Sequence, residues 1–167
     1  MRATVRLVVT APDGGLVAER RAHNTVLVSG ARLVADLFAG SGGAITHMGV
    51  GSSGENAGAV DTAALSNDDG AGQPALGGET TAAIPADRFD VTVDEERKRV
   101  VVRVRATLPE PAAVGTIREA ALVSRGAGGD VLYNRVVFAP LPKGDDHELT
   151  LFWEVEFPYG DLQWLAR

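Results

Sequence analysis

Residues 149–157, with the sequence LTLFWEVEF, carry the clearest structural signal in the chain. Apolar side chains stand at every second position, from Leu149 to Phe157, and Thr150, Glu154 and Glu156 stand between them. A period of two is typical of a β-strand that has one face in a core and the other toward solvent. The stretch therefore predicts a half-buried strand.

The same alternation recurs through most of the chain. Residues 3–9 and 16–23 flank the turn 11–15, whose Pro and Gly residues favour a hairpin. A second hairpin is predicted around the charged turn 95–98, and its outer face carries arginines. Strands are predicted at 3–9, 16–23, 45–51, 89–94, 99–108, 117–123, 131–138 and 149–157, and the run 140–146 is predicted to be a connection between the last two.

One helix interrupts this β pattern, at about 30–39. Ser29 is a candidate N-cap, and Gly40 stands where a left-handed C-terminal cap is expected. Leu33, Val34, Leu37 and Phe38 fall on one helical face. With the helix in place, the sequence predicts a mainly β protein, an antiparallel β-sandwich of about seven or eight strands with one short helix. Residues 1–157 form a single domain, and residues 158–167 a C-terminal interaction tail.

The segment 51–80 is an unusual connection within such a domain. It contains seven glycines and five acidic residues, and no lysine or arginine. Connections this long are commonly functional or mobile, and residues 66–80 are expected to become ordered only against a partner. Residues 60–65 are expected to form a helical turn that docks Leu65.

Composition excludes several classes of protein. The chain has 167 residues, is 45% hydrophobic and lacks cysteine, so disulfides, thiol nucleophiles and thiolate zinc sites are excluded. Its formal net charge of −6 argues against nucleic-acid binding. No apolar run approaches the roughly 18 residues of a membrane span, and the alternating N-terminus predicts a strand and not a signal peptide.

No set of residues in the sequence predicts catalysis. His23, His47 and His147 fall in three different elements, so we expect no metal site built from them. Asp68 and Asp69 offer oxygens to a cation but lack the ligand spacing of a calcium loop. We therefore expect a non-enzymatic protein without cofactor or metal, and whether an ion binds near these two aspartates is left open.

Two groups of residues are candidates for an interface. The first is basic and would dock an acidic partner, such as the acidic loop of a neighbouring copy, although a solvated hairpin face gives the same pattern. It consists of Arg97, Arg99, Arg103 and Arg105. The second is the large side chains of the tail, which are either interface anchors or a cover for the chain's own sandwich. It consists of Tyr159, Leu162, Trp164 and Leu165.

Short motifs over about residues 22–157 resemble small structural proteins of phage tails. The motifs are HNTV at 23–26, ITHMGVG at 45–51, DTAAL at 61–65, GTIREAAL at 115–122, LYNRVVF at 132–138, and Lys143 followed by LTLFW at 149–153. Such proteins occur among tail-fibre and baseplate components of phages and of related contractile injection particles. Residues 66–83 look like an insertion relative to that pattern.

The resemblance implies a non-enzymatic building block that assembles with copies of itself and with other tail or baseplate proteins. Its location would be the phage virion or tail-like particle, assembled in the bacterial cytoplasm. Arg118 and Glu119 are further interface candidates: Arg118 pairs either with a carboxylate across an interface or with one inside the chain.

Two other functions are carried as alternatives. One is a carbohydrate- or receptor-binding sandwich whose exposed aromatic side chains stack on sugar rings. The other is a hydrolase that uses paired carboxylates, for which Glu119, Glu154 and Glu156 are the candidates.

Overall fold

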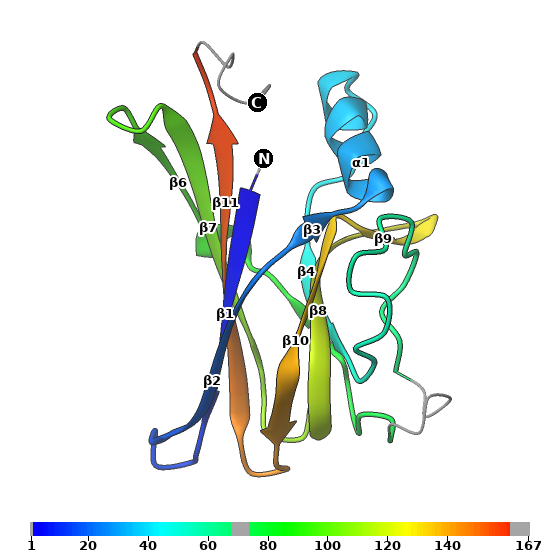
Figure 1. Cartoon of the computed structure of the whole chain (residues 1–167), viewed down its shortest axis with the longest axis vertical. Helices are drawn as coiled ribbons and strands as arrows, with labels where there is room; N and C mark the ends of the chain where they lie inside the picture. The colour runs from blue at the N-terminus through cyan, green and yellow to red at the C-terminus, as the bar shows by residue number, and fades with distance from the viewer. Residues whose placement is uncertain (1, 68–73, 161–167) are drawn as a thin grey trace.

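The computed structural model describes residues 2–67 and 74–160, and these form two antiparallel sheets packed face to face (Figure 1). The first sheet has the strand order β2-β1-β11-β7-β6. Its strands are β1 (Arg2–Thr10), β2 (Leu16–His23), β6 (Phe89–Asp94), β7 (Arg99–Leu108) and β11 (Glu148–Pro158).

The second sheet has the order β3-β10-β8-β4-β5, and β9 also pairs with β8. Its strands are β3 (Thr25–Val26), β4 (His47–Gly51), β5 (Thr81–Ala83), β8 (Gly115–Gly126), β9 (Gly129–Leu132) and β10 (Asn134–Lys143). The predicted mainly β sandwich with one helix is therefore confirmed, and the described residues contain slightly more strands than predicted.

The core lies between the two sheets, where the alternation predicted it. In β11, Leu149, Leu151 and Trp153 are at most 1% exposed. They face inward beside matching residues of β1 and β7, with Trp153 opposite both Val5 and Val104. The odd positions of β1 and β11 and the even positions of β7, from Val104 to Leu108, thus fill the core, and the positions between them form the outer face of the first sheet.

The helix α1 (Val28–Phe38) begins two residues before the predicted start. Ser29 does not cap it, because its hydroxyl donates to the Leu132 carbonyl at 2.6 Å and ties the helix to β9. Gly40, with φ of 74°, confirms the left-handed C-terminal position. The apolar face is only partly covered: Leu33 is buried, whereas Phe38 is 92% exposed.

A close backbone approach fixes the start of this helix against the second sheet. A Cβ added to Gly30 would lie 1.8 Å from the Tyr133 carbonyl oxygen. Only glycine fits there, so Gly30 sets how near α1 comes to the β9–β10 connection.

The connection after β8 differs from the prediction. A single strand was expected over 131–138, but the chain forms β9, bends at Tyr133 and continues as β10 to Lys143. β10 runs through Pro140 and Pro142, in the region predicted to be a connection. A register shift between Val137 and Leu141 accommodates this irregular part of the pairing with β8.

The glycine-rich loop is anchored on both flanks by the chain itself. The Asn67 side chain accepts from the Leu76 backbone N–H at 2.7 Å and donates to its carbonyl at 3.3 Å. Leu65 packs against a small cluster that includes Leu27 and Val123, as predicted, but residues 60–65 form no helical turn. The expectation that residues 66–80 become ordered only against a partner stays a prediction, because residues 68–73, which include Asp68 and Asp69, lie outside the described residues.

Candidate functional site

The most deeply buried ion pair in the described part of the chain joins Glu119 of β8 to Arg135 of β10. Arg135 Nε donates to Glu119 Oε2 at 2.5 Å, and the two side chains are 0% and 6% exposed. The second carboxylate oxygen accepts from the Ser66 backbone N–H at 2.6 Å. Burial raises the pKa of the Glu119 carboxyl, while the hydrogen bonds from Ser66 and Arg135 act in the opposite direction.

Arg135 extends this contact into the glycine-rich loop. Its two terminal nitrogens donate to the carbonyls of Asn56 at 3.0 Å and Glu55 at 2.8 Å. A Cβ added to Gly51 would lie 2.4 Å from Glu119 Oε1, so glycine is needed for the carboxylate to fit. The buried pair therefore fastens the first half of the loop to the second sheet. We call these two residues, with Ser66, the loop anchor.

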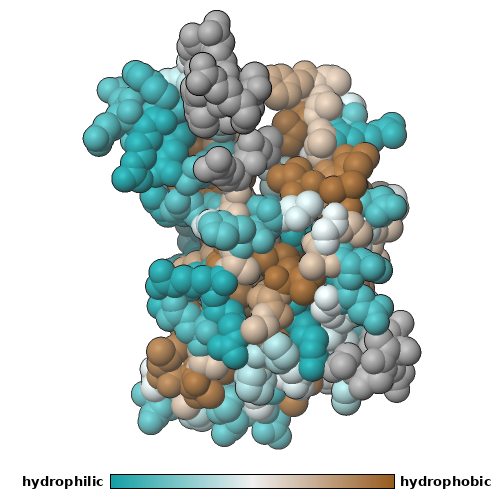
Figure 2. Space-filling model, in the orientation of Figure 1, coloured by the Kyte–Doolittle hydropathy of each residue, from teal (hydrophilic) through white to brown (hydrophobic). Residues whose placement is uncertain are grey.

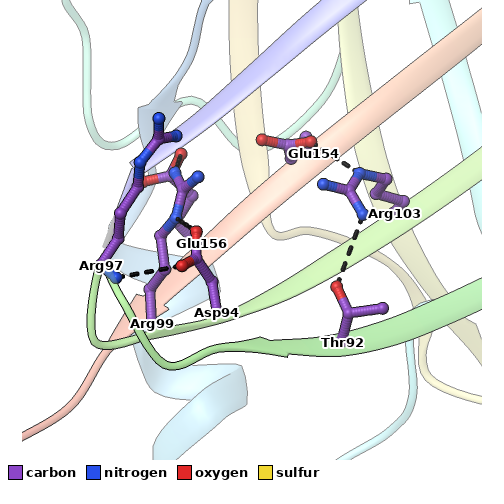
Figure 3. Close-up of polar contacts among 7 residues, drawn as sticks. All are labelled: Thr92, Asp94, Arg97, Arg99, Arg103, Glu154 and Glu156. Carbon is purple, nitrogen blue, oxygen red and sulfur yellow. Dashed lines mark hydrogen bonds and ion pairs between the residues drawn. The ribbon is translucent and has the colours of Figure 1, made fainter.

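The predicted carboxylate set for hydrolysis is not assembled. Glu119 is sealed within the second sheet, whereas Glu154 and Glu156 lie on β11 of the first sheet. Glu154 accepts from Arg103 at 2.8 Å, and Glu156 pairs with Arg99 (Figure 3). Each of these three carboxylates thus has its own arginine, an arrangement that stabilises strand pairing and leaves none of the three unpaired.

The histidines are also separate from one another. His47 contacts the Thr46 hydroxyl at 2.8 Å, and burial lowers its pKa. His147 lies 3.4 Å from Asp146, and His23 is at the end of β2. Within residues 2–67 and 74–160, no three histidine, aspartate or glutamate side chains gather where a metal ion could bind.

Two of the four arginines in the basic run, Arg99 and Arg103, are paired with carboxylates inside the chain. Arg99 bonds Asp94 at 2.9 Å as well as Glu156, and Arg103 also lies 3.8 Å from Asp90. The backbone N–H of the exposed Arg97 donates a hydrogen bond to the Asp94 carboxylate (Figure 3). The exposed side chains of Arg97 and Arg105 have no hydrogen bond or ion pair with any described residue, and of these two only Arg105 lines the groove described below.

Arg118 and the tail complete the predicted interface residues. Arg118 pairs with no carboxylate of the described chain and makes only a long contact, 3.5 Å, with the Ser52 carbonyl. Its neighbour Glu119 holds the internal pair instead, with Arg135. The Tyr159 backbone N–H donates to the Lys98 carbonyl, while Leu162, Trp164 and Leu165 lie outside the described residues.

The outer face of the first sheet contains a groove of about 740 Å³. It crosses all five strands and reaches the short 3-10 helix η1 (Ala86–Arg88). Five arginines and three carboxylates line it, together with Phe152. The arginines are Arg6, Arg21, Arg88, Arg103 and Arg105, and the carboxylates are Asp87, Asp90 and Glu154.

A second hollow, apolar and about 120 Å³, lies between α1 and the first sheet. Leu33, Val34 and Leu37 line it from the helix, and Val102 and Phe157 from the sheet. The helix stands at one end of the sandwich, opposite the ends of β6, β7 and β11 (Figure 1). We call this part of the molecule, which consists of α1 and the ends of β6, β7 and β11 that face it, the open end.

Apolar side chains also lie on the surface of the open end, and Figure 2 shows them over α1. Phe38, Val28 and Leu37 of α1 are 92%, 61% and 48% exposed. Val91 and Val93 of β6 are 63% and 61% exposed. They alternate with polar residues and therefore lie on the same face of the strand as Phe89. Large apolar surfaces of this kind mark interaction sites in soluble proteins.

Sequence reasoning missed three parts of these sites. Arg135 was quoted only within a motif, although an arginine in an otherwise apolar strand signals a buried ion pair. Arg6 and Arg21 line the same groove as Arg105 because β11 pairs with both β1 and β7, which are distant from it in sequence. The exposure of Phe38 depends on where the helix ends.

Comparison with protein-family models, with curated proteins and with solved structures found no match for this chain. No helix within the described residues is long and apolar enough to cross a membrane.

Proposed function

We propose that this protein is a structural assembly subunit of a phage tail or of a related contractile injection particle. It is associated with the baseplate or fibre, and it acts by contacts with copies of itself and with neighbouring proteins. The open end is the observation that carries this proposal, because its apolar side chains gain most when another protein covers them.

The size of the expected gain supports the same conclusion. Burying one phenylalanine or valine side chain stabilises a contact by about 1.5–3 kcal/mol. Phe38, Val91 and Val93 are each more than half exposed. Covering them contributes apolar anchors on both sides of the open end.

The residues that carry the phage-tail resemblance support the proposal in a second way. Glu119 and Arg135 are buried in the loop anchor, and the Asn134 side chain accepts from the Leu122 backbone N–H at 2.9 Å. Gly51, the last residue of the motif at 45–51, stands at a close approach to Glu119. The motifs therefore specify a scaffold, as expected for a building block whose function is its shape.

The two alternatives have less support. Sugar stacking needs exposed aromatic faces, and the groove offers none: Trp153 is 1% exposed and the Arg6 guanidinium lies over the Phe152 ring, 5.6 Å from its centre. Phe38 is exposed, but its exposed neighbours on α1, Val28 and Leu37, are apolar and offer no hydrogen bonds to sugar hydroxyls. The hydrolase needs neighbouring free carboxylates, and the three candidates are separate and paired.

The test is whether the protein enters particles. A tagged chain is expressed during particle production, and the particles are purified by sedimentation. The proposal expects the wild-type chain to be found with the particles at a fixed ratio and Phe38→Ser to be depleted. Leu16→Ser, which changes a 64% exposed residue of the β1–β2 hairpin, is the matched control and is expected to be retained. A wild-type chain absent from the particles would contradict the proposal.

A further inference from the structure

The groove on the outer face of the first sheet contains a row of cationic side chains at one level. Strand register places Arg21 opposite Arg6, Arg6 opposite Phe152, and Phe152 opposite Arg105. Arg88 immediately precedes Phe89, the partner of Val104, and so continues the row beyond Arg105. We call Arg21, Arg6, Phe152, Arg105 and Arg88 the arginine row.

Like charges on directly opposing strands destabilise a sheet, so the row needs an explanation. At one end the explanation is internal: Glu19 accepts from Arg6 at 3.0 and 3.2 Å and from Arg21 at 2.8 Å. The charge of Arg103, which lines the groove next to the row, is also compensated, because Arg103 pairs with Glu154 and Asp90.

The other end of the row has no such balance within the described chain. Arg105 has no hydrogen-bonding or ionic partner there. Arg88 has only Asp87, at 3.9 Å. Two guanidinium groups thus line one end of the groove, and the Asp87 carboxylate, beside Arg88, is the one described carboxylate that pairs with either of them.

We propose that the groove binds an acidic segment of a partner polypeptide, with Arg105 as the side chain that recognises its carboxylates. A guanidinium with free donors forms bidentate, charge-assisted hydrogen bonds to a carboxylate. The occupant therefore supplies the negative charge that the arginine row lacks at the Arg105 end. The choice of a polypeptide over another acidic ligand rests on the proposed assembly function.

The dimensions of the groove fix the length of the occupant. Five strands at about 4.8 Å spacing span about 19 Å, and an extended peptide rises about 3.3 Å per residue. About six residues therefore cross the groove. Its volume of about 740 Å³ lies within the range of about 300–1,000 Å³ typical of ligand sites.

The test is an NMR titration of the full-length protein, labelled with ¹⁵N, with the peptide hexaglutamate. The Arg105 Nε–Hε signal is expected to shift saturably, together with amides of the outer face of the first sheet. Arg105→Gln is expected to raise Kd about tenfold or more, since a charge-assisted hydrogen bond is lost. Arg97→Gln makes the same charge change at an exposed arginine outside the groove, and it is expected to change Kd less than twofold.

Three results would overturn the proposal: no saturable shift at millimolar hexaglutamate, equal effects of Arg105→Gln and Arg97→Gln, or tetragalacturonate binding as tightly with the same dependence on Arg105. The last result would assign the groove to an acidic carbohydrate. Phe38→Ser is expected to keep hexaglutamate binding and Arg105→Gln to keep any self-association. Failure of the groove proposal is thereby distinguished from failure of the assembly proposal.

Discussion

Replacing Glu119 by glutamine tests whether the phage-tail motifs build a scaffold. The substitution keeps the size of the side chain and an oxygen that accepts from the Ser66 N–H. It removes the negative charge beside Arg135, whose side chain is 6% exposed. Arg135 is then a buried cation held only by the carbonyls of Glu55 and Asn56.

The expected loss follows from the depth of the pair. Removing one partner of a buried ion pair costs about 3–5 kcal/mol, because the other charge stays buried without compensation. At about 2–4 °C per kcal/mol for a chain of this size, the melting temperature should fall by about 6–20 °C. Glu154→Gln breaks a pair whose side chains are 51% and 33% exposed, and it should cost about 0.2–1 kcal/mol.

The assay is urea unfolding at pH 7, followed by the fluorescence of the buried Trp153 and by far-UV circular dichroism. Hydrogen exchange should also show faster exchange at Ser66 in Glu119→Gln but not in Glu154→Gln. The double variant Glu119→Gln/Arg135→Met should recover part of the loss, since it removes the uncompensated cation. A loss in Glu119→Gln no larger than that in Glu154→Gln would refute the reasoning.

Two further predictions concern acid stability and close packing. Hydrogen bonds from Arg6 and Arg21 lower the pKa of Glu19 from 4.5 to about 2, so its contribution to stability is present above about pH 4.5 and is lost as the pH falls toward 2. Glu19→Gln should therefore lose less stability than wild type between pH 4.5 and 2 in urea titrations, and parallel curves would exclude this role. Gly30→Ala should destabilise the protein by about 3 kcal/mol or more, because its Cβ meets the Tyr133 carbonyl. Gly58→Ala, which meets nothing within 4 Å, should have little effect in the same unfolding assay; equal losses would contradict the packing argument.

The sandwich could be predicted because the alternation in residues 3–9 and 149–157 reports burial of one face, which is a local property of a strand. Helix α1 was predicted for a similar reason, from its apolar period and Gly40. The short β3 and β5 contain two and three residues, too few for a period to show. Their existence depends on the neighbouring strands β10 and β4, which are distant in sequence.

The candidate sites were less predictable because they depend on register. Arg99 and Arg103 looked like an unbalanced basic face, yet pairing of β7 with β11 brings Glu156 and Glu154 beside them. Arg105 looked like part of the same run, and only the paired structure shows that it lacks a counter-charge among the described residues. A linear sequence displays charges without their cross-strand neighbours, so it cannot separate these cases.

The central claim is that the open end of the sandwich makes contacts with other subunits. Sedimentation velocity of the purified full-length protein, over a hundredfold range of concentration, tests it most directly. The account predicts that the wild-type protein shifts from the 17.4 kDa monomer to a defined oligomer. Phe38→Ser should shift this transition to at least tenfold higher concentration, and Leu16→Ser should not. A wild-type protein that stays monomeric throughout, or an oligomer that Phe38→Ser leaves unchanged, would contradict the account.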